Sequence, residues 1–166
     1  MYLKEFCSNI EENVRNGSNL YIYSNITGNG KTAWAEKIIQ SYIESIWYKS
    51  DLLCKALFIN VPRFLIALKD SISNHNEYYQ HIKENVKDTD LVIWDDIGTK
   101  DSTQFEHDNL LSIIDTRMIE NKSNIFTSNI QPRNLESYLG PRLSSRIINY
   151  SNCIQFVGVD KRGIKE

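Results

Sequence analysis

A short glycine-rich stretch, Gly28-Asn29-Gly30-Lys31-Thr32, contains the residue types that bind a phosphate chain. Glycines allow the backbone N–H groups to wrap phosphate oxygens, and the lysine adds a positive charge that reaches the terminal phosphates. The threonine hydroxyl is suited to binding Mg²⁺. We expect these five residues, with the flanking Thr27 and Ala33, to contact the ligand.

The sequence on either side of this stretch supports a phosphate-binding loop. Residues 20–23 are typical of a buried strand, and a helix is expected directly after the loop, so its positive N-terminal end would face the phosphates. The full P-loop pattern has glycine five residues before Gly30, where this chain has Asn25. Because asparagine tolerates left-handed backbone angles, we expect an ATP-binding P-loop to form around it. The alternative is a glycine-rich turn that precedes a helix by chance.

Two consecutive aspartates follow another predicted strand. Leu91-Val92-Ile93-Trp94 is a buried-strand run, and Asp95 and Asp96 stand at its C-terminal end. A carboxylate there can hold Mg²⁺ directly or through water, and its neighbour can orient or deprotonate an attacking water molecule. We therefore assign Asp95, with Thr32, to the metal and Asp96 to the water. The alternative is that both aspartates only cap the strand.

The composition limits the possible functions. The chain has 166 residues, 41% hydrophobic and 24% charged, with a net charge of −2. No overall positive field attracts nucleic acid, so contact with DNA would need a local basic patch. The scattered Cys7, Cys54 and Cys153 do not predict a zinc site. Because the chain has neither a membrane-spanning apolar run nor a signal-peptide pattern, we expect a cytoplasmic protein that does not bind membranes.

The predicted strands alternate with helices, which indicates an α/β fold with a parallel sheet covered on both faces. We expect a helix over 1–17, a helical insertion over 62–88 and short helices over 132–138 and 141–149. The helix after the loop is expected to bury one face, with Ile38, Ile39, Tyr42, Ile43, Ile46 and Trp47. The expected strands are 20–23, 56–61, 91–94, 124–127 and 153–157. Residues 1–166 are predicted to form a single domain.

Four segments occur in a specific order, namely Thr27–Thr32, Leu91–Gly98, Thr127–Asn129 and Leu139–Arg146. In this order and spacing the chain resembles AAA+ ATPases, and most closely the replicative helicase loaders of bacteria and phages, the DnaC/DnaI type. IstB-like transposase helper ATPases are close relatives. The resemblance implies a three-layer P-loop NTPase fold with a five-stranded parallel sheet, a central first strand and no large helical lid. It also implies a weak ATPase that uses ATP and Mg²⁺ as a conformational switch.

The resemblance gives roles to residues outside the loop. Asn129 falls at the sensor-1 position, where an amide helps to hold the attacking water; otherwise it caps a turn. Arg146 falls at the arginine-finger position and would act on ATP bound to a neighbouring subunit, which implies self-association. Arg142, four residues earlier, could share its helix face. We favour Arg146 as the finger, the alternative being two surface arginines. Arg162 falls near the sensor-2 position, with Lys161 as a competitor.

The resemblance also implies partners, a DnaB-type replicative helicase and single-stranded DNA. Loaders of this type usually carry an N-terminal helicase-binding region, whereas one helix precedes the first strand here. The DNA candidates are Arg63, Lys69, Lys83 and Lys87, with Tyr78 and Tyr79 for base stacking. Acidic residues are interleaved with them, and the tyrosines also match a buried helix face.

The sequence thus predicts a helicase loader-like DNA replication protein. The alternatives are a transposase-helper ATPase of the IstB type and a small P-loop kinase acting on a nucleotide or metabolite. A kinase would need an arginine-bearing lid in the same subunit. The aspartate pair, Asn129 and the arginines after Gly140 fit an AAA+ protein better.

Overall fold

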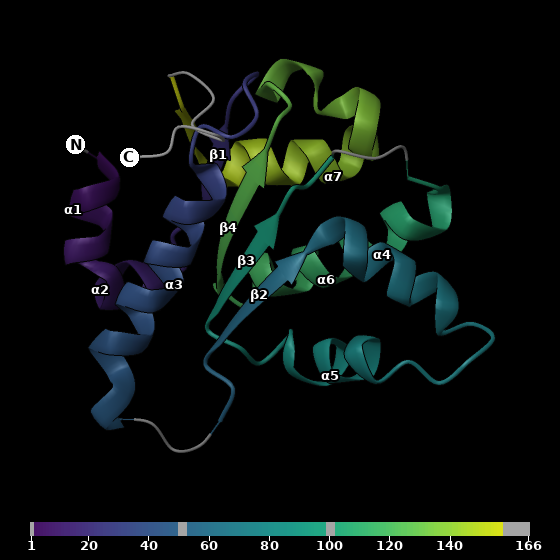
Figure 1. Cartoon of the computed structure of the whole chain (residues 1–166), viewed down its shortest axis with the longest axis horizontal. Helices are drawn as coiled ribbons and strands as arrows, with labels where there is room; N and C mark the ends of the chain where they lie inside the picture. Colours follow the sequence, from purple (N-terminus) through teal and green to yellow (C-terminus); the bar gives the residue numbers. More distant parts are fainter. Residues whose placement is uncertain (1, 50–52, 99–101, 158–166) are drawn as a thin grey trace.

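The fold is built on a five-stranded parallel sheet (Figure 1). The computed structural model describes residues 2–49, 53–98 and 102–157. The strands are β1 (Leu20–Tyr23), β2 (Ala56–Asn60), β3 (Leu91–Asp95), β4 (Ser123–Ser128) and β5 (Asn152–Gln155). Their order is β2-β3-β4-β1-β5, with every neighbouring pair parallel. The middle strand is β4, so the expectation of a central first strand is wrong by one position.

Helices cover both faces of the sheet (Figure 1). One layer contains α1 (Tyr2–Ser8), α2 (Ile10–Arg15) and α3 (Lys31–Ile46). The other contains α4 (Val61–Asp70), α5 (Glu77–Asn85), α6 (Gln104–Ile119) and α7 (Glu136–Tyr150). The 3₁₀ helices η1 (Trp47–Lys49) and η2 (Pro132–Asn134) extend the connections. In the described ranges, no helix has the length and apolar character needed to cross a membrane.

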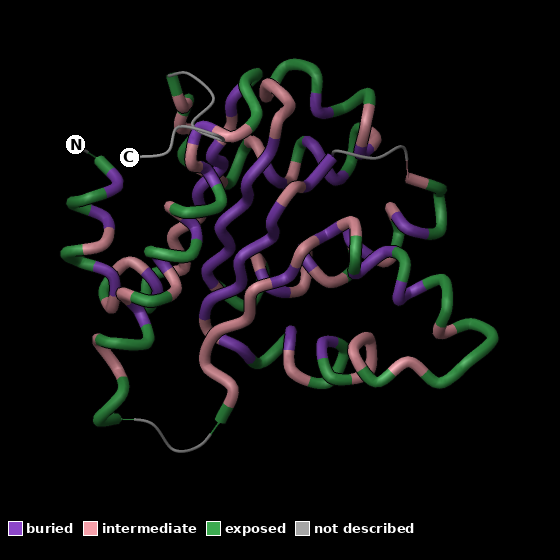
Figure 2. The backbone as a smooth tube through the Cα atoms, viewed as in Figure 1, coloured by how far each residue is buried: buried purple, intermediate pink, exposed green. Residues whose placement is uncertain are grey.

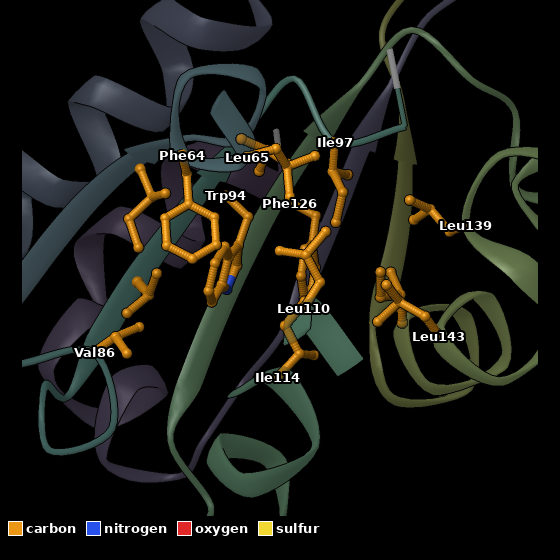
Figure 3. Packing of buried hydrophobic residues seen from close by; sticks show 14 of the residues in the cluster. Phe64, Leu65, Val86, Trp94, Ile97, Leu110, Ile114, Phe126, Leu139 and Leu143 are labelled. Atoms are coloured by element: carbon orange, nitrogen blue, oxygen red, sulfur yellow. The ribbon is translucent and has the colours of Figure 1, made fainter. Parts of the chain in front are cut away.

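Each face of the sheet has its own hydrophobic core. In β3, Leu91 and Ile93 pack against the α1–α3 layer, whereas Val92 and Trp94 pack against the α4–α7 layer. Successive side chains of a strand point to opposite faces, so a strand covered on both sides tends to be a continuous apolar run, as β3 is up to Trp94. The strands β3 and β4 are buried along their length, and β1 is buried except at Tyr23 (Figure 2). In β4 only Ile125 and Phe126 are apolar, and its polar ends are also buried. Trp94 and Phe126 lie at the centre of the second core, together with Phe64 and Leu110 (Figure 3).

Several element boundaries differ from the sequence predictions. The expected first helix is two helices. The break expected between the helices over 132–138 and 141–149 is present, because Gly140, with φ 73° and ψ 165°, interrupts α7. The first of these two helices begins as η2. Val61 opens α4 rather than ending β2, and β5 begins at Asn152. In α3, Ile38 and Tyr42 are buried, but Ile43 is 49% exposed, and Trp47, just beyond α3 in η1, is 73% exposed. The apolar face of α3 is therefore narrower than its sequence suggested.

At the amino ends of the strands, the guanidinium of Arg117 is completely buried. Its Nε donates to Asn124 Oδ1 at 2.7 Å, and its Nη groups donate to the carbonyls of Val86, Thr89 and Ser123. Burial lowers the pKa of Arg117 to about 9, so the group is still charged at neutral pH. Arg117 thereby joins α6 to the connection before β3 and to the start of β4.

We expect Arg117→Met to lower the free energy of unfolding by about 3 kcal/mol, because the buried oxygens that Arg117 contacts lose their donors. Urea denaturation followed by circular dichroism measures the change. Arg133→Met, at an exposed position in η2, is the matched control and should change stability by less than about 0.5 kcal/mol. Equal stability of the two variants would show that the Arg117 contacts do not hold these segments together.

Candidate functional site

The loop between β1 and α3 lies at the carboxyl edge of the sheet, at the top of the view in Figure 1. Gly28 and Gly30 have φ angles of 70° and 95°. A Cβ atom at Gly30 would meet nothing within 4 Å, so the left-handed backbone, and not crowding, favours glycine there. Asn25 is exposed and is not in the left-handed region. The expected compensation at Asn25 is therefore wrong, since the loop turns at its glycines.

Ser24 anchors this loop to the sheet. Its backbone N–H donates to Ser128 O at 3.2 Å, and its Oγ accepts from the backbone N–H of Ile26 at 3.1 Å and from Asn29 Nδ2 at 2.6 Å. The same amide of Asn29 lies 3.4 Å from Phe156 O, just after β5. The loop is thus fastened to both strands that flank β1.

Lys31 is the first residue of α3, and it is 6% exposed. Its Nζ donates to Ile26 O at 3.2 Å and to Asn29 Oδ1 at 3.3 Å, so the ammonium lies against the loop. Carbonyl and amide oxygens are weaker acceptors for an ammonium group than phosphate oxygens. A phosphate bound in the loop would therefore draw the ammonium away from these two oxygens.

Asp95 gathers donors from three elements. Its Oδ1 accepts from Thr32 Oγ1 at 3.0 Å and from Thr127 Oγ1 at 2.7 Å. Asn60 is paired with Asp95 in the strand register, and its Nδ2 lies 3.4 Å from Oδ2. An octahedral Mg²⁺ with oxygens at about 2.1 Å separates adjacent ligands by about 3 Å. Thr32 and Asp95 therefore fit the expected metal-ligand pair.

Asp96 and Asn129 face the same cavity as the loop. The cavity has a volume of about 450 Å³ and is lined by Thr27, Gly28, Gly30, Lys31, Thr32, Asp96 and Asn129. Asp96 has φ 58°, and its backbone N–H donates to Thr127 Oγ1 at 3.0 Å. Asn129 Oδ1 is buried and has no hydrogen-bond partner among the described residues. A buried amide oxygen without a donor is costly, so a bound water or ligand would satisfy it.

The segments that carry Asp96 and Asn129 are tied to each other. Ser128 Oγ donates to Ile97 O at 2.6 Å and accepts from the backbone N–H of Ile130 at 3.1 Å. The hydroxyl of Tyr21, whose pKa is raised by burial, donates to Ile130 O at 2.9 Å. These bonds keep both side chains at the mouth of the loop.

The structure places some of the predicted site residues at the phosphate cavity and others away from it. Of the expected phosphate contacts, Asn29 and Ala33 do not line the cavity, and Asn29 is turned towards Ser24. Thr127 is a contact that the sequence analysis missed. It belongs to a segment already singled out at the end of a strand, but its contacts with Asp95 and Asp96 join residues about 30 positions apart, so nothing in the local sequence indicated them. Arg162 and its competitor Lys161 lie outside the described residues.

The two arginines of α7 lie elsewhere. Arg142 and Arg146 line a second cavity, also of about 450 Å³, which shares no lining residue with the phosphate cavity. Arg146 Nε lies 2.8 Å from Asp115 Oδ1. The described chain therefore holds one arginine-lined surface and one phosphate-type cavity at separate places.

The DNA candidates of α4 and α5 are only partly available. The guanidinium of Arg63 lies over the ring of Tyr78 at 4.6 Å. Tyr79 packs against Phe64 in the core, with ring centroids 5.8 Å apart. Lys69 Nζ makes a 3.2 Å ion pair with Glu106. Arg63 is exposed, whereas Tyr78 is half-buried and packs against the same core as Tyr79. The cation–aromatic contact of Arg63 and Tyr78 is thus the clearest feature of this segment.

Comparison with known proteins agrees with this architecture. The chain is 26% identical over 145 residues to the replicative helicase loader DnaC of Buchnera aphidicola, covering 87% of this chain and 54% of the relative. It is 25% identical over 162 residues to the replicative helicase loader DnaI of Bacillus subtilis, covering 88% and 48%. The chain thus spans about half the length of the curated relatives it matches.

The fold has a solved counterpart in the crystal structure of the DnaC helicase loader. The TM-score is 0.76 at 19% identity, and the match covers 94% of this chain and 86% of that one. The sequence profile of the bacterial DnaA ATPase domain matches residues 5–151. Because that match includes the loop, both aspartates and Asn129, this chain belongs to the family of the bacterial DnaA ATPase domain.

Proposed function

We propose that this chain is an ATP-binding and weakly ATP-hydrolysing helicase loader-like DNA replication protein, which helps to place a replicative helicase on single-stranded DNA. The two relatives named replicative helicase loaders support this proposal. So does membership of an ATPase family. The partner, the DNA and self-association are part of the proposal.

One observation supports this proposal most directly. Within one chain, the phosphate cavity is separate from the arginine surface, which is the surface of α7 that bears Arg142 and Arg146. Lys31, Thr32 and Asp96 line the cavity, but neither Arg142 nor Arg146 does. A second subunit that placed α7 against this cavity would supply the missing charge. ATP hydrolysis would then depend on assembly, as suits a switch.

The side chains at the cavity have separate chemical roles in this proposal. The first turn of α3 and Lys31 bind the terminal phosphates. Thr32 holds Mg²⁺ together with Asp95, which does not line the cavity but is bonded to Thr32. The metal neutralises charge that develops on the phosphate oxygens. Asp96 and the unpaired amide oxygen of Asn129 orient the attacking water.

The arginine surface also bears on the alternatives. A small kinase closes an arginine-bearing lid over the phosphates of its own subunit, whereas here the arginines of α7 face a different cavity. A transposase-helper ATPase would use the same site and differ in its partner. The choice between loader and helper is therefore a question of partner, which a binding experiment answers.

For DNA we propose α4 and α5, where Arg63 and Tyr78 offer a cation and an aromatic ring together. Such pairs bind phosphates and stack on bases of single strands. Lys83, over the ring of Tyr79 at 6.0 Å, extends the same surface. Lys69 contributes less in this proposal, because Glu106 already pairs with it.

We expect Lys31→Ala to abolish ATP binding, whereas Asp96→Asn and Arg146→Ala should retain binding and lose hydrolysis. The loss for Arg146→Ala should exceed about 100-fold, since an arginine finger contributes about 10³- to 10⁵-fold. A fluorescent ATP analogue reports binding, and phosphate release reports hydrolysis. Full hydrolysis by Arg146→Ala would rule out the finger, and a small phosphorylated product would rule out a loader.

We expect Thr127→Val to raise the Mg²⁺ concentration needed for half-maximal hydrolysis by at least about 10-fold, as outer-shell partners of a metal ligand commonly do. The reason is that Thr127 orients Asp95 through the 2.7 Å bond. Phosphate release in a magnesium titration measures the effect. Thr116→Val, which loses only a bond to Ser112 O on α6, is the matched control. An unchanged titration for Thr127→Val would contradict this role.

The partner is tested by a pull-down of a DnaB-type helicase by the ATP-bound chain, with an IstB-type transposase as competitor. We expect the helicase to be retained and the transposase not, and we expect single-stranded DNA to stimulate hydrolysis. Lys31→Ala provides the nucleotide-free control. Retention of the transposase alone would replace the loader proposal with the helper ATPase.

A further inference from the structure

Arg146 is held in place by α6. It lies in the part of α7 that follows the bend at Gly140, where α7 packs against α6. Its Nε is 2.8 Å from Asp115 Oδ1, with side-chain exposures of 42% for Arg146 and 31% for Asp115. The guanidinium also faces the ring of Tyr150 at 5.8 Å, and Nη1 lies 3.5 Å from its hydroxyl. Two groups of the same chain thus restrain one exposed arginine.

The burial of Asp115 favours its ion pair with Arg146. Asp115 Oδ1 is buried, and although it lies 2.8 Å from Arg146 Nε, this contact is an ion pair without the geometry of a hydrogen bond, and no other described residue donates to the oxygen. A desolvated carboxylate oxygen needs a nearby positive charge, and Arg146 supplies it. Within the described ranges, no comparable ion pair is recorded for Arg142, which is exposed one helical turn earlier. The restraint is therefore specific to Arg146.

The ion pair with Asp115 does not occupy the outer nitrogens of the guanidinium, of which Nη1 makes a long contact of 3.5 Å with the Tyr150 hydroxyl. Asp115 lies beside Nε, whereas phosphate oxygens are bound in a bidentate way by N–H groups that include the outer Nη atoms. An arginine held in this way loses less rotamer freedom when it meets a phosphate. The ion pair does not bury the arginine, because the side chains of both Arg146 and Asp115 are partly exposed to solvent.

We propose that Asp115 is a positioning residue: its ion pair with Arg146 holds the guanidinium at the Nε side, so that the Nη groups can be presented to the terminal phosphate of ATP bound by a neighbouring subunit. This inference rests on the proposed intersubunit hydrolysis. Asp115 itself touches no reacting atom. Its effect must therefore appear in the subunit that donates the arginine, not in the one that binds the ATP.

Mixed subunits test this separation. An Arg146→Ala subunit keeps its ATP site but lacks the finger, and a Lys31→Ala subunit keeps the finger but lacks ATP. We expect their mixture to hydrolyse ATP although neither does so alone. Adding Asp115→Asn to the Lys31→Ala donor should lower the rescued rate by about 10-fold or more, because a slightly misplaced group is costly in catalysis. Adding it to the Arg146→Ala acceptor should leave the rate unchanged.

Three controls make the result specific. Asp115→Glu in the donor should restore part of the rate, since it returns the charge. Asp108→Asn, an exposed carboxylate of the same helix that accepts from Gln104, should have no effect in the donor. Thermal unfolding of each variant checks that it is folded.

The outcomes are distinguishable. An equal loss in donor and acceptor, or no loss in the donor, overturns the positioning role while the finger of Arg146 stands. If Arg146→Ala alone hydrolyses ATP as fast as the unsubstituted chain, or if the mixture hydrolyses ATP no faster than its two components do alone, the intersubunit proposal itself is overturned and the role of Asp115 with it.

Discussion

One carboxylate oxygen of Asp95 accepts two threonine hydroxyls, from Thr127 on the neighbouring strand and from Thr32 in the first turn of α3. This contact joins two neighbouring strands, β3 and β4, to the start of α3. It fixes the start of α3 relative to the end of β3, and the phosphate loop lies between β1 and that start. The hydroxyl of Thr127 also accepts a hydrogen bond from the backbone N–H of Asp96. The side chain of Thr127 therefore helps to position both aspartates.

This arrangement requires a sheet that does not shift. Two separate hydrophobic cores pack against the two faces of the inner strands, and large side chains such as Trp94 fill one of these cores (Figure 3). At the opposite edge, the buried Arg117 ties α6 to the beginnings of β3 and β4. With the strand starts fixed and the faces packed, the side chains at the strand ends can be placed by short polar bonds.

The groups needed for the proposed reaction lie at two separate places in the molecule. The cavity of the loop offers an ammonium, hydroxyls, the carboxylate of Asp96 and the Asn129 amide oxygen, which has no hydrogen-bond partner among the described residues. The surface of α7 offers two arginines, one of them restrained by Asp115. In the proposed function, an assembly joins the α7 surface of one subunit to the cavity of the next. The energy of that contact then controls a reaction that each subunit performs poorly alone.

The amino-acid sequence was sufficient to predict features that depend on residues close together in the chain. The loop of Gly28 and Gly30 and the strand that ends in Asp95 depend on residue types a few positions apart. The order of segments indicated the family, and the role expected of Asn129 came from that resemblance. Element boundaries at Val61 and Asn152 were less accurate, because neighbouring packing decides where a helix or strand ends.

Contacts between distant segments depended on the tertiary structure. The alternation of strands and helices predicts a parallel sheet but leaves the strand order open, and that order brings Thr127 between Asp95 and the loop. Burial of Arg117 and the pairing of Arg146 with Asp115 follow from the packing of α6. A charged residue looks the same in sequence whether water or protein surrounds it. The sequence alone therefore identified the phosphate chemistry, and only the packed fold determined which side chains orient it.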